Sequence, residues 1–95
     1  MIRSFHCKES RKVFHGVTSK KLPETILRPA RRKLRMLHAA ATLKDISSPP
    51  SNHLEKLVGK RAGQYSIRIN SQWRICFFWR NGNACEVEIV DYHKG

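Results

Sequence analysis

The residues best suited to chemistry stand near the end of the chain, where Asp91, Tyr92 and His93 follow an apolar stretch. Each of these side chains can exchange a proton or form a hydrogen bond. Cleavage of a phosphodiester needs a base, an acid and cations that stabilise the extra negative charge of the transition state. In a chain of formal net charge +12, this ending suggests a ribonuclease rather than a protein that only binds RNA. A short motif of this kind also occurs at solvated strand ends that carry a packed tyrosine.

Three antiparallel strands would position these residues, because apolar and polar side chains alternate along three successive segments. The segments span about 65–70, 73–80 and 85–90. A three-residue loop at 70–72 would place Arg68 opposite Arg74 and Ile67 opposite Ile75, with the large apolar side chains on one face. We therefore expect this loop to close the first hairpin.

The second hairpin is expected to turn at Asn81-Gly82-Asn83, again because this loop length buries one apolar face. The pairs that it predicts are Trp79 with Cys85, Phe77 with Val87, and Ile75 with Ile89.

Ionisable side chains gather on the outer face of this predicted sheet. Arg68 and Arg74 lie opposite each other there, and like charges so placed repel unless an anion such as an RNA phosphate lies beside them. The same alternation puts Tyr92 on the face of Arg74. Because Glu86 and Glu88 also share this face, ordinary surface ion pairs are an alternative explanation for the arginines.

The first half of the chain is expected to be helical and more basic. Ile2 to Phe5 is expected to form a short strand, followed by a helix from about Lys8 to Phe14 that ends near Gly16. The stretch from Ser47 to Asn52 has the composition of a loop and would join this half to the strands.

A second, amphipathic helix is expected from about Pro23 to Ala41, where apolar residues recur at helical spacing. Pro29 cannot donate a backbone hydrogen bond, so the helix should restart or kink there, with its firm part from Ala30 onward. Arginines occupy the remaining surface of this helix: Arg28, Arg31, Arg32 and Arg35. This basic face is either solvated or the binding surface of an anionic partner.

Size and composition restrict the class of protein. A chain of 95 residues should form one domain, 1–95. Its excess of basic over acidic residues favours nucleic acid, an anionic membrane or an acidic protein as partner. We expect neither a membrane span nor a secretory leader, and we expect a cytoplasmic protein. The spacing of the cysteines and histidines predicts free thiols (Cys7, Cys76 and Cys85) and no metal or other cofactor.

Several segments, in order along the chain, resemble the HigB-type toxins of the RelE/ParE superfamily, which belong to bacterial type II toxin–antitoxin systems. The matching segments are Met1 to Phe5, Leu54 to Leu57 with Gly59, Gly63 to Asn70, Trp73 to Ile75, and Val90 to His93. The resemblance implies an α+β, RelE-like single domain in which two N-terminal helices pack on a mostly antiparallel sheet. It also implies ribosome-dependent cleavage of mRNA and a HigA-type antitoxin with a helix-turn-helix domain, through which alone the toxin would meet operator DNA.

By resemblance, Arg74, Asp91, Tyr92 and His93 match the catalytic residues of the family. Better-known members have a histidine where this chain has Glu55 and a lysine where it has Val58. We expect Glu55 to join the catalytic group, either with weaker activity or with a different division of roles, and nearby bases to replace the missing charge. The residues expected to bind RNA or the ribosome are Lys56, Lys60, Arg61, Arg68, Arg31, Arg32 and Arg35.

Two alternatives from another functional class stay open at this point. The chain is either catalytic, or a basic RNA-binding module, or a degenerate toxin retained as the partner of its antitoxin. The superfamily also contains gyrase poisons with the same fold, so fold alone does not decide the function. The terminal Asp91, Tyr92 and His93 favour the nuclease.

Overall fold

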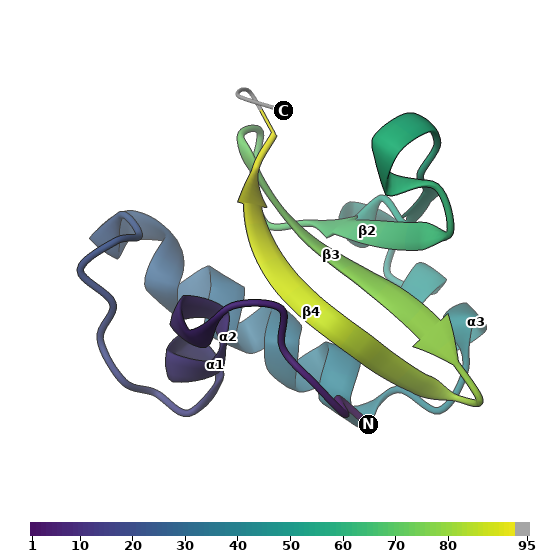
Figure 1. Cartoon of the computed structure of the whole chain (residues 1–95), viewed down its shortest axis with the longest axis horizontal. Coiled ribbons are helices and arrows are strands. Elements are labelled where there is room, and N and C mark those ends of the chain that lie inside the picture. Colours follow the sequence, from purple (N-terminus) through teal and green to yellow (C-terminus); the bar gives the residue numbers. More distant parts are fainter. Residues whose placement is uncertain (93–95) are drawn as a thin grey trace.

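Helices cover one face of a four-stranded antiparallel sheet in the computed structural model, which describes residues 1–92 (Figure 1). The strands follow the order β1-β2-β3-β4 across the sheet. The helices are α1 (Lys8–Phe14), α2 (Glu24–Ala39), α3 (Leu43–Ser47) and the short 3₁₀ helices η1 (Pro50–Asn52) and η2 (Gly59–Arg61). The strands are β1 (Glu55–Lys56), β2 (Gln64–Arg68), β3 (Trp73–Arg80) and β4 (Asn83–Asp91). This arrangement confirms the expected α+β class.

The hydrophobic core lies between α2 and the inner face of the sheet. Ile67, Ile75 and Phe77 from β2 and β3 are fully buried there against Leu34 and Leu37 of α2. The register of the first hairpin is the expected one, since Ile67 pairs with Ile75 and Arg68 pairs with Arg74. The alternation along these strands therefore directs the polar side chains, including Arg74, to the opposite face of the sheet.

The turn of the second hairpin differs from the expectation. Arg80 pairs with Asn83 and Trp79 pairs with Ala84, so the loop has two residues and the predicted Trp79–Cys85 pair is wrong. The reason is the Asn81-Gly82 turn, in which both residues have positive φ, 51° and 77°, as a two-residue type I′ hairpin requires.

A β-bulge restores the expected register farther along this hairpin. Between the pairs Cys76–Glu88 and Phe78–Cys85, β4 has one residue more than β3. Glu86 takes up the extra residue with φ of 50°, which is left-handed backbone. Beyond the bulge Ile75 pairs with Ile89, as predicted. The bulge thus keeps Glu86 out of the core while Val87 and Ile89 remain inside.

Helix α2 runs from Glu24 to Ala39 with Pro29 inside it, so the expectation that the firm helix begins near Ala30 is wrong. A proline in the second turn removes only one backbone hydrogen bond. Burial of Ile26 and Ala30 on either side of it stabilises the helix enough to continue.

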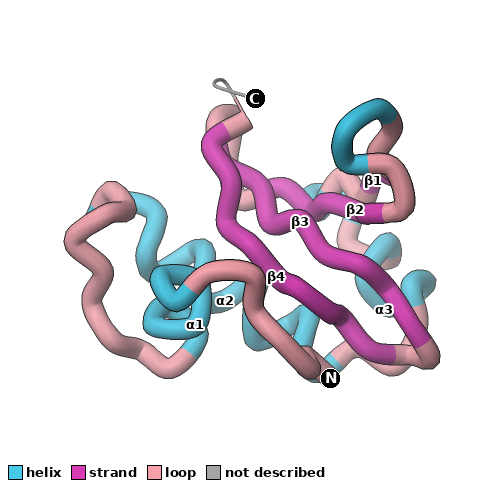
Figure 2. Tube along the Cα trace, in the orientation of Figure 1, coloured by secondary structure: helices cyan, strands magenta, loops and turns pink. Residues whose placement is uncertain are grey.

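The N-terminal segment lies beside β4 (Figure 2), but it is not the strand expected from the sequence. Only two isolated parallel bridges join it to β4, at Ile2–Ala84 and Phe5–Val87. Helix α1 has the predicted bounds, and Gly16 follows its end with φ of 76°.

The stretch from Ser47 to Asn52, expected to be a loop, contains the short helix η1, and a further short helix that was not predicted, α3, lies before it and ends at Ser47. Helix α3 begins with a capping box, in which the Thr42 side chain accepts a hydrogen bond from the Asp45 backbone N–H and the Asp45 side chain accepts one from the Thr42 backbone N–H.

The three cysteines are free thiols, as expected: Cys76 is buried, and Cys7 and Cys85 are half-buried. Within residues 1–92, no helix is both long and apolar enough to cross a membrane.

Candidate active site

Arg74 is the centre of the site and is only 8% exposed. Its Nε donates to the Ser66 hydroxyl of β2 at 2.8 Å, and its Nη2 donates to the His53 carbonyl at 2.5 Å. A guanidinium with two of its nitrogens bound in this way has little rotational freedom. Arg74 is therefore not the solvated strand residue that a simple outward-facing position predicts.

The turn that supplies the His53 carbonyl is itself held from two directions. Buried Asn52 donates through Nδ2 to the Ile46 carbonyl of α3 at 2.8 Å and accepts from Lys33 Nζ of α2. Burial, together with the nearby charge of Arg32, lowers the pKa of Lys33. These contacts connect the helical layer to the position of Arg74.

Glu55 provides the only ion pair of Arg74 among the described residues. Its carboxylate lies 3.6 Å from Arg74 Nη1, and its side chain is 54% exposed. The ion pairs expected with Glu86 or Glu88 are not formed by Arg74, because Glu88 instead pairs with Arg61 at 3.3 Å. The carboxylate beside the buried arginine is thus open to solvent and can be displaced by another anion.

Tyr92 is held close to Arg74 at the end of β4, whereas Asp91 pairs with Trp73, and the alternation along β4 directs it to the opposite face of the sheet. The Cζ of Arg74 lies 5.4 Å from the centroid of the Tyr92 ring, which confirms that the two residues share a face. Gln72 accepts from the Tyr92 backbone at 2.7 Å and donates through its side chain to Asp91 at 3.0 Å. His93, expected to complete this group, lies outside the described residues.

A small polar cavity of about 250 Å³ opens at this point. Its lining includes Arg68, Arg74, Glu55 and Tyr92, so four of the residues expected to act together do meet. Two guanidinium groups and a phenol around a small cavity suit a phosphate group, which arginine binds through several hydrogen bonds.

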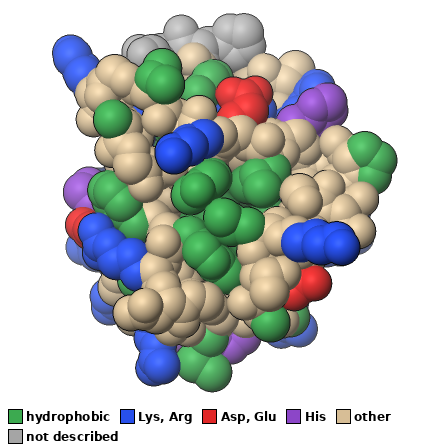
Figure 3. Space-filling model, turned by 90° about the vertical axis from the view of Figure 1, so that its right-hand side faces the viewer, with side chains coloured by type: hydrophobic (Ala, Val, Ile, Leu, Met, Phe, Trp, Pro, Cys, Tyr) green, Lys and Arg blue, Asp and Glu red, His purple; other side chains and the backbone are tan. Residues whose placement is uncertain are grey.

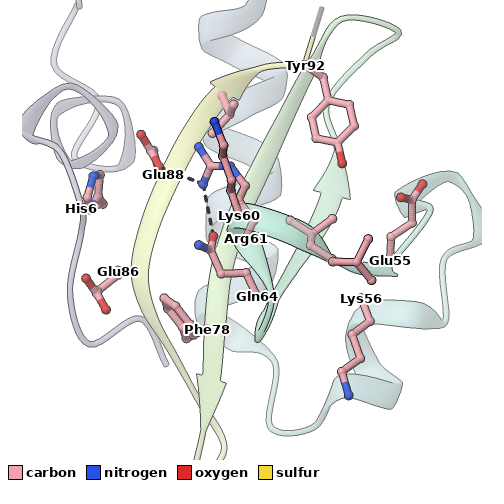
Figure 4. Close-up of a pocket in the computed structure, with 13 residues that line it drawn as sticks. His6, Glu55, Lys56, Lys60, Arg61, Gln64, Phe78, Glu86, Glu88 and Tyr92 are labelled. Carbon is pink, nitrogen blue, oxygen red and sulfur yellow. Dashed lines mark hydrogen bonds and ion pairs between the residues drawn. The ribbon is translucent and has the colours of Figure 1, made fainter. Parts of the chain in front are cut away.

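A larger groove of about 770 Å³ adjoins the cavity and shares Glu55 and Tyr92 with it (Figure 4). Lys56, Lys60 and Arg61, which the sequence predicts to bind RNA, line this groove. Val58, which stands where the resemblance implies a lysine, also lines it and is 84% exposed.

The arginines of α2 lie away from the site around Arg74, because α2 packs on the inner face of the sheet whereas Arg74 lies on the outer face. Arg32 and Arg35 are exposed, and the half-buried Arg31 packs over Gly16. The structure therefore separates the expected RNA-binding residues into two surfaces.

On the side of the molecule that carries α3, Lys and Arg side chains are spread around a central hydrophobic group (Figure 3).

Three contributors to the site were not predicted from the sequence. Ser66 was detectable, since it alternates with Ile67 and so faces the same side as Arg68. The Gln72 contact depends on the hairpin bringing residue 72 beside Asp91. The His53 carbonyl has no sequence signal, because it depends on a left-handed residue with φ of 46° after η1.

Cys76 lies on the outer face near Arg61 and Arg74 without being available for chemistry. Its side chain is fully buried, and this burial raises the pKa of the thiol despite the two nearby arginines. A buried thiol with a raised pKa stays neutral and poorly reactive. Among residues 1–92, no group of three or more His, Cys, Asp or Glu is arranged to hold a metal ion.

The helices packed on a four-stranded antiparallel sheet agree with the RelE-like class of α+β proteins. Residues 3–93 match the family described as the RelE-like toxin of the type II toxin–antitoxin system HigB. The chain belongs to this HigB-like toxin family, and it is accordingly a toxin of type II toxin–antitoxin systems.

Curated relatives agree with this assignment. Toxin HigB-1 of Vibrio cholerae is 40% identical over 73 residues, which are 77% of this chain and 76% of the relative. Endoribonuclease HigB of Proteus vulgaris is 32% identical over 94 residues, which are 98% of this chain and all of the relative. An uncharacterized protein of Haemophilus influenzae is 40% identical over 70 residues, covering 74% of this chain and 69% of the relative.

Proposed function

We propose that this toxin is a ribosome-dependent endoribonuclease that cleaves mRNA and thereby inhibits translation. The observation that carries the proposal is the fixed guanidinium of Arg74, which borders a polar cavity together with Arg68 and Tyr92. The relative named Endoribonuclease HigB aligns with nearly the whole chain and supports the endoribonuclease part of the proposal.

In the proposed reaction, the 2′-hydroxyl of the RNA attacks the adjacent phosphorus and the bond to the 5′-oxygen breaks. The products are a 2′,3′-cyclic phosphate, which water can open to a 3′-phosphate, and a free 5′-hydroxyl. Arg74, assisted by Arg68, stabilises the additional charge of the pentacoordinate transition state. Because Arg74 is already oriented by Ser66 and His53, little reorganisation is needed when this charge develops.

Protons move through the carboxylates and the histidine of the site. His93 or Asp91 acts as base or acid, and histidine suits both roles because its pKa is near neutrality. Glu55, beside Arg74, is a further candidate for the base. Tyr92 orients the phosphate or stacks on a base of the single-stranded message.

Basic residues on both surfaces bind the ribosomal RNA backbone. Near the site these are Lys56, Lys60 and Arg61, and on α2 they are Arg31, Arg32 and Arg35. Binding through phosphates should weaken as the salt concentration rises. The protein acts in the cytoplasm, where a HigA-type antitoxin with a helix-turn-helix domain neutralises it and alone brings it to operator DNA.

The Arg74–Glu55 ion pair also favours one alternative, a degenerate toxin whose main remaining role is to bind its antitoxin. A carboxylate in the position where the phosphate should bind neutralises the central cation and lowers its affinity for RNA. Weak cleavage of mRNA by the wild type would support the nuclease. A complete lack of cleavage would support the degenerate toxin.

Purified protein incubated with an mRNA, in the presence and absence of translating ribosomes, tests the proposal. We expect new RNA ends only with ribosomes and only from the wild type, while the double variant Arg74→Ala, His93→Ala produces none. Cleavage of the naked message at the same sites would overturn the dependence on ribosomes. Absence of wild-type cleavage in both samples would favour the degenerate toxin.

A further inference from the structure

The larger groove has two walls of opposite charge. Lys56, Lys60 and Arg61 come from β1 and η2 on one side, while Glu86 and Glu88 come from β4 on the other (Figure 4). With Glu55, three of the seven acidic residues of this strongly basic chain line the groove. A phosphate backbone is attracted to the first wall and repelled from the second, so the groove orients an RNA strand across its width.

Glu86 has an unusual backbone for its residue type. It is the residue of the β-bulge with φ of 50°, a conformation that glycine adopts at much lower cost than glutamate. Its N–H donates to the Ser4 hydroxyl at 2.8 Å, which stabilises the bulge. Bulges next to active sites commonly redirect a side chain. Here the bulge brings to the groove a carboxylate that regular alternation after Ala84 would direct toward the core.

The two carboxylates of the acidic wall differ in their availability. Glu88 pairs with Arg61, and the same Arg61 nitrogen also donates to Gln64 at 3.3 Å. The exposed Glu86 carboxylate forms no ion pair with any of residues 1–92. Glu86 is therefore the acceptor in this wall that a ligand can use without breaking an ion pair.

Phe78 supplies an aromatic surface between the two walls. Phe78 lines the groove. Arg80 lies outside the groove lining and packs over the Phe78 ring, with its Cζ 4.6 Å from the ring centroid. Gly63 keeps the ring uncovered from the side of β2, since a Cβ there would lie 3.4 Å from Phe78 Cε1. An aromatic ring beside hydrogen-bonding side chains is the usual means by which proteins bind the splayed bases of single-stranded RNA.

We propose that this groove binds a guanine base next to the scissile phosphate, with Glu86 accepting hydrogen bonds from its Watson–Crick edge. A carboxylate can only accept, and guanine presents two adjacent donors on this edge, N1–H and the N2 amino group. Cytosine presents a single amino donor, so the carboxylate discriminates against it. The groove volume of about 770 Å³ lies in the range of about 300–1,000 Å³ typical of ligand sites. The inference rests on the proposed nuclease function, because the shared residues Glu55 and Tyr92 connect the groove to the cleavage site.

Calorimetric titration of the purified protein with guanosine 3′-monophosphate and cytidine 3′-monophosphate tests this inference. We expect the wild type to bind the guanosine nucleotide about tenfold more tightly. The variants Glu86→Gln and Glu86→Gly should lose this preference. The glycine variant relieves the left-handed backbone and so is expected to fold at least as well as the wild type. Glu24→Gln, an equal change of charge at the start of α2, should keep the preference.

Equal affinity of the wild type for the two nucleotides would overturn the inference, as would a preference that persists in both Glu86 variants. A Glu86-dependent affinity for a lysine-rich peptide, without nucleotide binding, would overturn it in favour of a protein ligand. Cleavage of ribosome-bound mRNA, measured on the same preparations, separates this inference from the proposed function. If cleavage occurs without guanine preference, only the base site is wrong. If Glu86-dependent preference occurs without cleavage, the base site stands and the nuclease function is wrong.

Discussion

Ser66 holds Arg74 in place, with its hydroxyl 2.8 Å from the Nε of the arginine. Ser66 is fully buried and Arg74 nearly so, and both side chains lie on the outer face of the sheet. A surface arginine would sample many rotamers, whereas this one is presented in a single orientation. The orientation of the central cation therefore depends on a serine in the neighbouring strand.

Substitution of Ser66 by alanine should destabilise the fold and slow cleavage. The change leaves a buried guanidinium N–H without its partner, which costs about 1–3 kcal/mol. Urea unfolding should show this loss, and single-turnover cleavage should slow because Arg74 is less well oriented. Ser51→Ala, at an exposed position of η1, is the control and should change neither quantity. An unaltered cleavage rate in Ser66→Ala would show that the hydrogen bond does not position Arg74.

Gln72→Ala should slow cleavage with little change in stability. The side-chain amide of Gln72 donates to the Asp91 carboxylate at the end of β4, over 3.0 Å, so its removal takes one hydrogen bond from that carboxylate. The backbone bond from Tyr92 to Gln72 does not depend on the side chain and should survive. We expect a several-fold decrease in the cleavage rate and a free energy of unfolding within about 0.5 kcal/mol of that of the wild type. A cleavage rate equal to that of the wild type would contradict a positioning role for Gln72.

Glu55→Gln should bind inorganic phosphate more tightly and cleave RNA more slowly. Removing the carboxylate 3.6 Å from Arg74 Nη1 leaves that nitrogen free for an anion. If Glu55 is also the base, the amide cannot accept the proton and the reaction slows. Phosphate titration and single-turnover cleavage measure the two effects separately. Tighter phosphate binding together with faster cleavage would show that Glu55 only competes with the substrate.

Stability should decrease in acid partly through Asp45. Hydrogen bonds from the backbone N–H groups of Ala41 and Thr42 lower the pKa of Asp45. A carboxyl whose pKa is lower in the folded state stabilises the fold above its unfolded pKa of about 3.9, and this contribution is lost as the pH falls through the folded value. Urea midpoints at pH 6 and at pH about 2.5 should therefore differ less in Asp45→Asn than in the wild type. Equal differences in the two proteins would show that Asp45 does not contribute.

Much of the fold and part of the site follow from the sequence. The alternation of apolar residues and the need to bury one face were enough to place Arg68 opposite Arg74 and Tyr92 on the face of Arg74. The bounds of α1 also followed from local signals. These predictions succeeded because each depended on a periodic pattern or on a glycine at a helix end.

The remaining features depend on local conformations that compete with periodicity. Asn81-Gly82 formed the shorter turn because both residues tolerate positive φ, and the bulge at Glu86 then corrected the register. The capping box at Thr42 and Asp45 was a readable signal for α3 that the composition of the following loop obscured. The burial of Arg74 was not readable, because it requires the His53 carbonyl to approach from a turn twenty-one positions away in the sequence.

The central claim is that Arg74 enables cleavage of mRNA on the ribosome, and mapping of mRNA 5′ ends in cells that express the toxin tests it most directly. The matched variants are Arg74→Lys, which keeps the charge but loses the fixed guanidinium, and Arg11→Lys, the same change at an exposed position of α1. We expect new codon-phased 5′ ends from the wild type and from Arg11→Lys, and few or none from Arg74→Lys. Ends of equal abundance from Arg74→Lys, or no new ends from the wild type, would contradict the claim.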